Sequence, residues 1–399
     1  MWIGEWRSRR LVLSLRADGL TLSWGDPHDP LVLSYDGAGR LWSAYEAGAH
    51  YRRALNGRVL CKQAAGTHRA ARRWLTPPEA DALLARASAT VAALLEEWER
   101  MHGAGGLISL REMLALAAQF TPARAAEDAA AFARIYRPIG ILPPDQYLAL
   151  VLQMTEGCSF NSCTFCGFYR DRPFRIKSVD AFRQHIAQAL AFFGAGLSMR
   201  RSIFLGDANA LVLPMPRLLP LLHVVAEMCD VPRLGLYAFL DGFSGERKRA
   251  EDYRALAELG LRRIYIGMES GDAELLHLLH KPGTPEDVRA AVAAMKAGGV
   301  AVGVIILVGA GGERFAEAHI CNTTALLNAM PLDADDIIYF SDLVITEDLP
   351  YAQQAREADL RPLDQAGLDA QRRAIISGLR FRPPCAPRLS RYDIRAFIY

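Results

Sequence analysis

The sequence lacks a strong excess of charge of either sign, since 46 Lys and Arg residues stand against 44 Asp and Glu residues. A balance this even gives no reason to expect nucleic acid or an acidic membrane as a partner. The sequence also lacks any apolar run near the roughly 18 residues of a membrane span. Its start, MWIGEWRSRRLVL, is charged where a secretory signal is apolar. We therefore expect a cytoplasmic protein with no membrane partner.

Cysteine is scarce, with 7 among 399 residues, and the odd number argues against a complete disulfide framework. In a reducing compartment, a tight group of cysteines is more often a metal site than a set of disulfides. Cys158, Cys163 and Cys166 form such a group in the stretch EGCSFNSCTFCGFYR. No second Cys or His pair completes a four-ligand zinc site. A 4Fe-4S cluster held by three thiolates instead leaves one iron open to a small chelator.

The first third of the chain changes from strand-like to helix-like patterning. Apolar and polar residues alternate between turn signals from 11 to 62, which predicts a small β-meander in an N-terminal lobe, residues 1–75. The stretches TPPE at Thr76 and SLRE at Ser109 carry the capping signals of helix starts. We expect accessory helices over 77–101, 109–120 and 122–136, in a segment that covers residues 76–143.

Residues 144–345 alternate short apolar strands with amphipathic helices. Strands are predicted over 147–155, 202–207, 234–240, 263–269, 301–309 and 336–341. Helices are predicted over 178–194, 215–229, 246–259, 284–298 and 313–329, with a last one over 363–379 in a C-terminal extension, 346–399. This order predicts an α/β fold with a parallel sheet, either doubly wound or an incomplete (β/α) barrel. Active sites in such folds lie at the carboxyl ends of the strands, where the cysteine stretch follows the first strand.

With these features the chain resembles the radical SAM superfamily, and most closely the branch of Elp3 and the coproporphyrinogen-oxidase-like enzymes. That family places a Cys-x3-Cys-x2-Cys loop after the first strand of a partial (β/α)6 barrel, with an aromatic residue before the third cysteine. Here Phe165 precedes Cys166. The first gap holds four residues, so the loop is C-x4-C-x2-C and departs from the family pattern by one residue. The resemblance covers residues 147–345.

Three further stretches are similar to strand-end motifs with which that family binds S-adenosylmethionine (SAM). FLGDANAL (204–211) resembles the motif that receives the methionyl amine, and IYIGMESGD (264–272) resembles the motif near the ribose or carboxylate. LVGAGGE (307–313) is similar to the glycine motif that lies against adenine, with Ala-Gly where Leu-Pro is commoner. The resemblance implies SAM contacts at Phe165, Gly206, Asp207, Glu269, Ser270, Val308 and Gly309.

The resemblance therefore implies an enzyme. Cys158, Cys163 and Cys166 are expected to hold a 4Fe-4S cluster, and SAM to be cleaved reductively to a 5'-deoxyadenosyl radical. That radical is expected to abstract hydrogen from a small organic substrate, with an electron donor such as flavodoxin or ferredoxin as a partner. Nucleic acid is not favoured, because no RNA-binding module is recognisable. A peptide or RNA substrate stays an alternative.

The remaining candidates are weaker. Cys385, in the stiff stretch RPPCAP, is a candidate catalytic residue, as a hydrogen donor or ligand. His277 and His280 share a helix face, and without a third ligand nearby we expect ordinary surface or core histidines. A non-catalytic iron-sulfur protein that transfers electrons or senses redox state would explain the cysteines alone. It would leave the strand-end motifs without a role.

Overall fold

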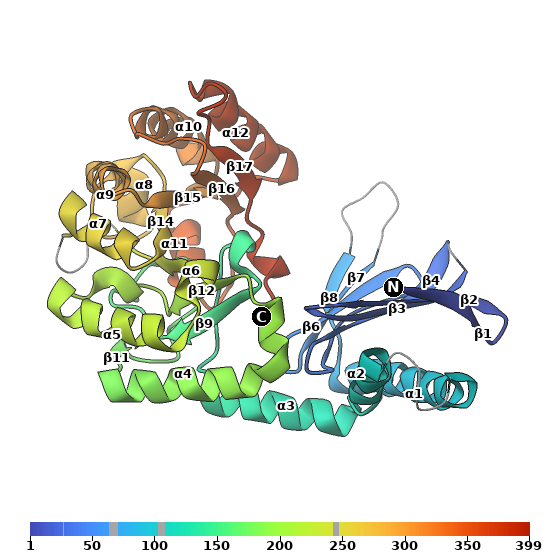
Figure 1. Ribbon diagram of the computed structural model, residues 1–399. Coiled ribbons are helices and arrows are strands. Elements are labelled where there is room, and N and C mark those ends of the chain that lie inside the picture. The colour runs from blue at the N-terminus through green and yellow to red at the C-terminus, as the bar shows by residue number, and fades with distance from the viewer. Residues whose placement is uncertain (27, 64–70, 103–107, 242–246) are drawn as a thin grey trace. The chain divides into compact units, whose positions relative to one another are not determined.

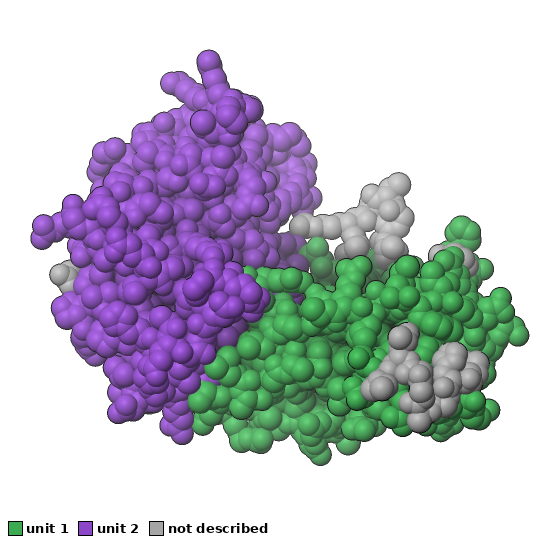
Figure 2. Space-filling model, viewed as in Figure 1, with its two compact units in different colours: residues 1–138, 187–201, 398–399 green, residues 139–186, 202–397 purple. Residues whose placement is uncertain are grey.

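The protein is described by a computed structural model that covers residues 1–26, 28–63, 71–102, 108–241 and 247–399 (Figure 1). The chain divides into two compact units, drawn in different colours in Figure 2. The first comprises residues 1–138, 187–201 and 398–399, and the second residues 139–186 and 202–397. The β-rich lobe and nearly all of the accessory-helix segment belong to the first unit. The strands predicted after residue 144 belong to the second.

The first unit contains an eight-stranded antiparallel sheet in which each strand pairs with the next along the chain. This confirms the predicted meander and adds a strand at either edge, before residue 11 and after residue 62. The strands are β1 (Trp2–Trp6), β2 (Arg9–Arg16), β3 (Gly19–Asp26), β4 (Asp29–Asp36), β5 (Leu41–Glu46), β6 (Ala49–Arg53), β7 (Val59–Gln63) and β8 (Ala71–Trp74). Alternate residues of β2, β3 and β4 are buried, as expected when one face of a sheet packs on a core.

Three helices of the first unit lie where the sequence predicts them: α1 (Pro77–His102), α2 (Ile108–Ala118) and α3 (Pro122–Ile135). The buried side chains of α1 and α2 share a hydrophobic core with the leucines of the sheet. Thr121 caps α3, because its hydroxyl accepts a hydrogen bond from the Arg124 amide. These contacts make the sheet and its helices one packed unit.

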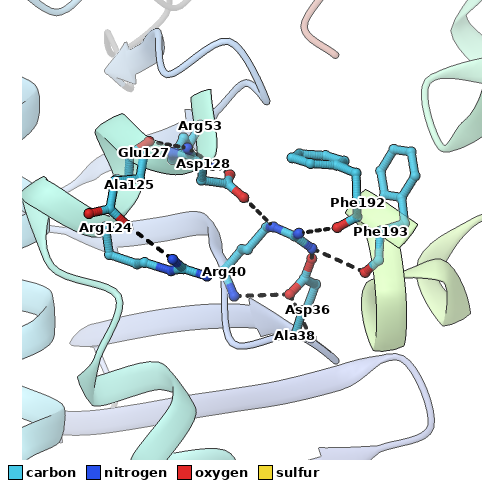
Figure 3. Close-up of polar contacts among 10 residues, drawn as sticks. All are labelled: Asp36, Ala38, Arg40, Arg53, Arg124, Ala125, Glu127, Asp128, Phe192 and Phe193. Atoms are coloured by element: carbon cyan, nitrogen blue, oxygen red, sulfur yellow. Dashed lines mark hydrogen bonds and ion pairs between the residues drawn. The ribbon is translucent and has the colours of Figure 1, made fainter. Parts of the chain in front are cut away.

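A buried ionic network joins α3 to the sheet (Figure 3). Arg40 donates from Nε to Asp128 over 2.7 Å and pairs with Asp36 over 3.3 Å, while Arg53 pairs with Asp128 over 3.1 Å. Arg40 also donates to the carbonyls of the last two residues of α4 (Val179–Phe193). These carbonyls have no partner inside the helix, so the guanidinium caps it. Two guanidiniums and two carboxylates thus compensate one another in the interior.

The second unit contains a seven-stranded parallel sheet in the order β17-β16-β15-β14-β13-β12-β9. All six predicted strands are present: β9 (Ala149–Gln153), β12 (Ser202–Gly206), β13 (Leu236–Phe239), β14 (Leu261–Glu269), β15 (Ala301–Val308) and β16 (Ile337–Asp342). The prediction missed β17 (Arg388–Arg391), because RLSR is short and mostly exposed and so has no buried apolar alternation. The sheet is open, with β17 and β9 at its edges, as in an incomplete barrel.

Helices alternate with these strands, and α5, α7, α9, α10 and α12 follow one another in an arc outside the sheet (Figure 1). The helices after α4 are α5 (Met215–Met228), α6 (Val231–Leu234), α7 (Ala250–Glu258), α8 (Ala273–Leu278), α9 (Pro285–Ala297), α10 (Gly312–Asn328), α11 (Pro350–Glu357) and α12 (Gln365–Gly378). The short α6 and α11 were not predicted. A helix face shared by His277 and His280 was expected where α8 lies, but α8 ends at Leu278, so His280 lies beyond it. Residue 246, where one predicted helix begins, lies outside the described residues. No helix in the described ranges combines the length and apolar character needed to cross a bilayer.

A polar network fills the interior of the parallel sheet at the amino ends of its strands. The carboxylate of Asp145 accepts hydrogen bonds from the hydroxyls of Tyr265 (2.6 Å) and Tyr339 (2.7 Å) and pairs with Arg263 over 3.1 Å. Gln146 donates to the Tyr265 hydroxyl and accepts from the Ser202 hydroxyl. Burial raises the pKa of Tyr265 well above its ordinary value, so its hydroxyl stays protonated as a donor. These bonds connect strands β12, β14 and β16 at this end of the sheet.

Candidate active site

The three clustered cysteines lie on one loop at the carboxyl end of β9. A short antiparallel pair, β10 (Thr155–Glu156) and β11 (Arg175–Ile176), brings the two ends of this loop together. The loop thus leaves the parallel sheet at the end where chemistry occurs in such folds. This is the placement that the sequence predicts.

Cys158, Cys163 and Cys166 line the same cavity, whose empty volume is about 1140 Å³ including the space open to solvent. Its other walls come from the strand ends, where alternate residues of each strand face the interior. They include Phe239, Asp241, Tyr265, Gly267, Glu269, Ile305, Leu307, Ser341 and Asp342. Most of the wall area is apolar or aromatic, so the cavity can exclude water around a reacting group.

The three thiols have the chemistry of ligands for an iron-sulfur cluster. In the described parts of the chain, no group of three His, Cys, Asp or Glu side chains is placed to hold one metal ion. A 4Fe-4S cluster makes a different demand, because each thiolate binds a different iron. Burial raises the pKa of Cys163 to about 12 and also raises the pKa of Cys166. Iron would supply the positive charge that stabilises the thiolates in this apolar setting.

The cysteine loop is shaped by its own side chains. Arg170 donates from Nε to the carbonyl of Cys166 (2.8 Å) and from Nη2 to the carbonyl of Cys163 (2.9 Å). Asn161 has φ of 51°, in the left-handed region that Asn tolerates better than most residues. The main-chain amide of Asn161 donates a hydrogen bond to the sulfur of Cys158 over 3.4 Å. The first gap, one residue longer than in the family pattern, contains this left-handed residue.

The segment after α8 is bonded to this loop. The amide of Thr164 donates to the carbonyl of Leu279 (3.0 Å), and Nδ1 of His280 donates to the carbonyl of Ser162 (3.0 Å). Since a carbonyl only accepts, this contact requires a proton on Nδ1. Sequence reasoning treated His280 as an ordinary histidine, and nothing in the local sequence marks its contact with a loop 118 residues away.

Glu269 and Lys281 form an ion pair in the wall of the cavity. Nζ of Lys281 lies 3.1 Å from Oε1 of Glu269, and only 13% and 9% of the two side chains are exposed. Burial alone would lower the pKa of Lys281, but the charges of Glu269 and Cys163 outweigh it and raise the pKa. The sequence predicted Glu269 and missed Lys281, which lies outside every motif. The pair places one positive and one negative group beside the cysteines.

Asp207 does not line the cavity, although the resemblance implies a SAM contact there. Its Oδ2 accepts from the Gly157 amide (2.9 Å) and from Arg172 (3.1 Å), and its Oδ1 accepts from the Gln153 side chain (2.9 Å). Burial raises the pKa of Asp207, although Arg172 and the Gly157 amide oppose the shift. Gly206, the last residue of β12, lies behind it and likewise does not line the cavity.

Phe165 lines the cavity, whereas three other predicted SAM contacts do not. The hydroxyl of Ser270 is hydrogen-bonded to Nδ1 of His319 over 2.7 Å, and burial lowers the pKa of that histidine to about 4. Val308 is buried, and the amide of Gly309 donates to the side chain of Gln371 (2.7 Å). Their roles toward SAM stay untested predictions.

Cys385 is exposed on the segment between α12 and β17 and does not line the cavity with the other cysteines. Two residues of the tail that the sequence did not single out, Tyr392 and Ile394, do line it. The Tyr392 hydroxyl donates to the carbonyl of Leu142 over 2.7 Å. Leu142 precedes β9 at one edge of the sheet, and Tyr392 follows β17 at the other. The tail therefore completes the cavity where the two edges of the open sheet face each other.

Residues 152–322 match the family described as the Radical SAM superfamily. The matched range begins in β9 and includes the cysteine loop, Asp207, Glu269 and Lys281. The chain therefore contains a radical SAM domain, which confirms the superfamily predicted from the sequence. Members of this superfamily are enzymes.

Solved structures similar to this chain include the cobalamin-dependent S-adenosylmethionine radical enzyme OxsB, at 16% identity and a TM-score of 0.38, covering 55% of this chain and 30% of that one. Coproporphyrinogen III oxidase (HemN) from Escherichia coli is 14% identical, with a TM-score of 0.43. The match covers 62% of this chain and 54% of HemN. Elp3 from Methanocaldococcus infernus is 13% identical, with a TM-score of 0.35. The match covers 54% of this chain and 44% of the Elp3 chain. The chain thus spans from about a third to about half of these proteins. No curated protein matches it.

Proposed function

We propose that this protein is a radical SAM enzyme in which Cys158, Cys163 and Cys166 hold a 4Fe-4S cluster. The observation that carries the proposal is that one loop presents all three thiols to an apolar cavity at the carboxyl ends of a parallel sheet. When bound, a reduced cluster would supply the electron that cleaves SAM to methionine and a 5'-deoxyadenosyl radical, and that radical would take a hydrogen atom from the substrate.

The Glu269–Lys281 pair is the best candidate in the cavity for orienting SAM. SAM carries an ammonium, a carboxylate and ribose hydroxyls, so it needs both a negative and a positive partner. Glu269 can accept from the ammonium or the hydroxyls, and Lys281 can donate to the carboxylate. Both groups sit in a wall from which water is largely excluded, where charge-assisted hydrogen bonds are stronger than in water.

The walls favour a small organic substrate. Aromatic and aliphatic side chains make up much of the cavity wall, including Tyr169, Phe239, Ile305, Tyr392 and Ile394. Such a lining binds the apolar part of a substrate by van der Waals contact. A few polar side chains, here Asn209 and Asp241, would then orient the substrate. A separate reductant such as flavodoxin or ferredoxin would deliver the electron. All seven cysteines are free thiols, which suits a reducing compartment such as the cytoplasm.

Anaerobic reconstitution with iron and sulfide tests this function. We expect about four irons per chain and formation of 5'-deoxyadenosine when SAM and dithionite are added. A reconstituted protein that binds the cluster but yields no 5'-deoxyadenosine, and whose electron paramagnetic resonance (EPR) signal ignores SAM, would instead be an electron carrier or redox sensor. Tight binding of one zinc with no uptake of iron would refute both.

A further inference from the structure

The carboxylate of Asp207 is fully engaged by residues around the cysteine loop. Its side chain is only 2% exposed, and the guanidinium of Arg172 with which it pairs is only 7% exposed. The amide of Asp207 is also tied, since it donates to both the carbonyl and the hydroxyl oxygen of Thr155 at 3.0 Å. Asp207 is therefore fixed from its main chain as well as from its side chain.

The residues that donate to this carboxylate lie on both sides of the three cysteines in the sequence. Gly157 immediately precedes the first cysteine, and Arg172 follows the third by six residues. One oxygen, Oδ2, accepts from both of them, so a single atom joins the beginning of the loop to its end. The other oxygen accepts from Gln153, the last residue of β9, which anchors the junction to the sheet. All three cysteines lie on the segment that this junction closes.

We propose that Asp207 is a positioning residue that holds the cysteine loop in its ligating conformation, and that it does not contact SAM. The inference rests on the proposed function, since it concerns how the loop holds a cluster. Both oxygens of the Asp207 carboxylate already accept hydrogen bonds, and the residue does not line the cavity, so it is poorly placed to bind the ammonium group of SAM. Removing its charge takes away one of the two carboxylates that pair with the buried guanidinium of Arg172, the other being Asp171, and weakens the bonds that join the two ends of the loop.

The size of the effect follows from metal sites in general. Residues that orient ligands without touching the metal typically change metal affinity by about 10- to 100-fold when they are replaced. We therefore expect Asp207→Asn, which keeps the shape but loses the charge, to release iron to a chelator about 10- to 100-fold faster than the parent. SAM affinity of the clusters that stay intact should be unchanged, because the cavity wall is untouched.

Asp336→Asn is a matched control. Asp336 is also buried, also pairs with a cation, Lys296 at 2.8 Å, and also accepts from a main-chain amide, that of Val302. It lies just before β16, at the opposite end of the sheet from the cysteines. Both variants should lower the melting temperature of the cluster-free protein to a similar extent. Only Asp207→Asn should accelerate the loss of iron.

The experiment measures iron release by chelator absorbance and SAM affinity by EPR titration of the reduced, reconstituted full chain. A slow, parent-like release in Asp207→Asn overturns the proposal, and weaker SAM binding with a stable cluster would assign Asp207 to SAM instead. Arg172→Gln gives a second test: it should reproduce the fast release, and the double variant should be no faster than either single one. If the increases in iron-release rate of the two single variants multiply in the double variant, the two residues act separately, which contradicts a shared junction. If the parent itself takes up no cluster, the proposed function fails as well.

Discussion

The two ends of the parallel sheet are built from the same strands but are used in opposite ways. At the amino ends, Asp145 joins Tyr265, Tyr339 and Arg263 in one network of hydrogen bonds and an ion pair. At the carboxyl ends, three thiols and the Glu269–Lys281 pair face a cavity. Strand β14 contributes to both, since Arg263 belongs to the network and Glu269 ends the strand at the cavity, while Tyr265 between them bonds to Asp145 and also lines the cavity.

This difference separates stabilising chemistry from functional chemistry within one sheet. Polar side chains that bond only to one another make a filled, rigid interior, and they leave nothing over for a ligand. Polar side chains that face an empty volume are available to one. Barrels of parallel strands generally place stability at the amino end and reactivity at the carboxyl end. Substitutions at the two ends should therefore move different measurements.

The largest effect is expected at the carboxyl end. Replacing Cys158, Cys163 or Cys166 by Ala should abolish the cluster, because each thiolate supplies the only protein bond to one iron. Iron content and the broad absorbance of the reconstituted protein measure this. Cys321→Ala and Cys385→Ala, which change exposed thiols away from the cavity, should keep the cluster. Retention of a full cluster after any of the first three changes would contradict the assignment.

At the amino end, Asp145→Ala should lower the free energy of unfolding by at least about 2 kcal/mol, since it leaves the hydroxyls of Tyr265 and Tyr339 without their acceptor. Denaturant unfolding of the cluster-free protein measures the loss. Glu286→Ala, which removes a solvent-exposed ion pair with Arg289, is the control and should have a far smaller effect. The contrast between the two ends breaks down if Asp145→Ala weakens SAM binding in the reconstituted protein.

Glu269→Ala should weaken SAM binding, which Asp145→Ala should leave unchanged. It removes a charge-assisted hydrogen bond but no iron ligand, so the cluster should assemble while SAM affinity falls. Such bonds contribute about 1.5–3 kcal/mol, which corresponds to a loss of roughly tenfold to more than a hundredfold. EPR titration with SAM measures it in parent and variant. Equal affinities would remove Glu269 from the SAM site and leave the rest of the proposed function standing.

Lys281→Met sharpens the same test with a second ligand. If Lys281 meets the carboxylate of SAM, the parent should prefer SAM over decarboxylated SAM by a larger factor than the variant does. A preference that is the same in both proteins would show that Lys281 does not contact this carboxylate.

The smallest effect is expected at Tyr392, where the tail closes the cavity. Tyr392→Phe removes one hydrogen bond, to the carbonyl of Leu142, and leaves the ring in place. We expect a loss of about 1 kcal/mol in the free energy of unfolding, with an intact cluster and unchanged SAM affinity. Thermal and denaturant unfolding of the two proteins test this, and a loss of cluster would show that the tail does more than complete the wall.

Much of this architecture could be predicted because its signals are local. Apolar runs flanked by helical patterns identified six of the seven parallel strands, and the spacing of three cysteines after the first of them located the loop. Strand β17 escaped prediction because RLSR packs through main-chain pairing with β16 and carries no apolar pattern of its own. The short α6 and α11 escaped because one or two turns carry too few residues to establish a helical period.

The sequence by itself determined the approximate positions of six of the seven parallel strands, which loop carries the thiols, and that Glu269 ends a strand. The tertiary structure decided which side chains meet. It turned Asp207 toward Arg172, 35 residues away, and brought Lys281 to Glu269. It also placed Tyr392 against Leu142 across 250 residues. Patterns in sequence report the period of one element, whereas these contacts depend on how elements from distant parts of the chain pack together, which no local pattern encodes.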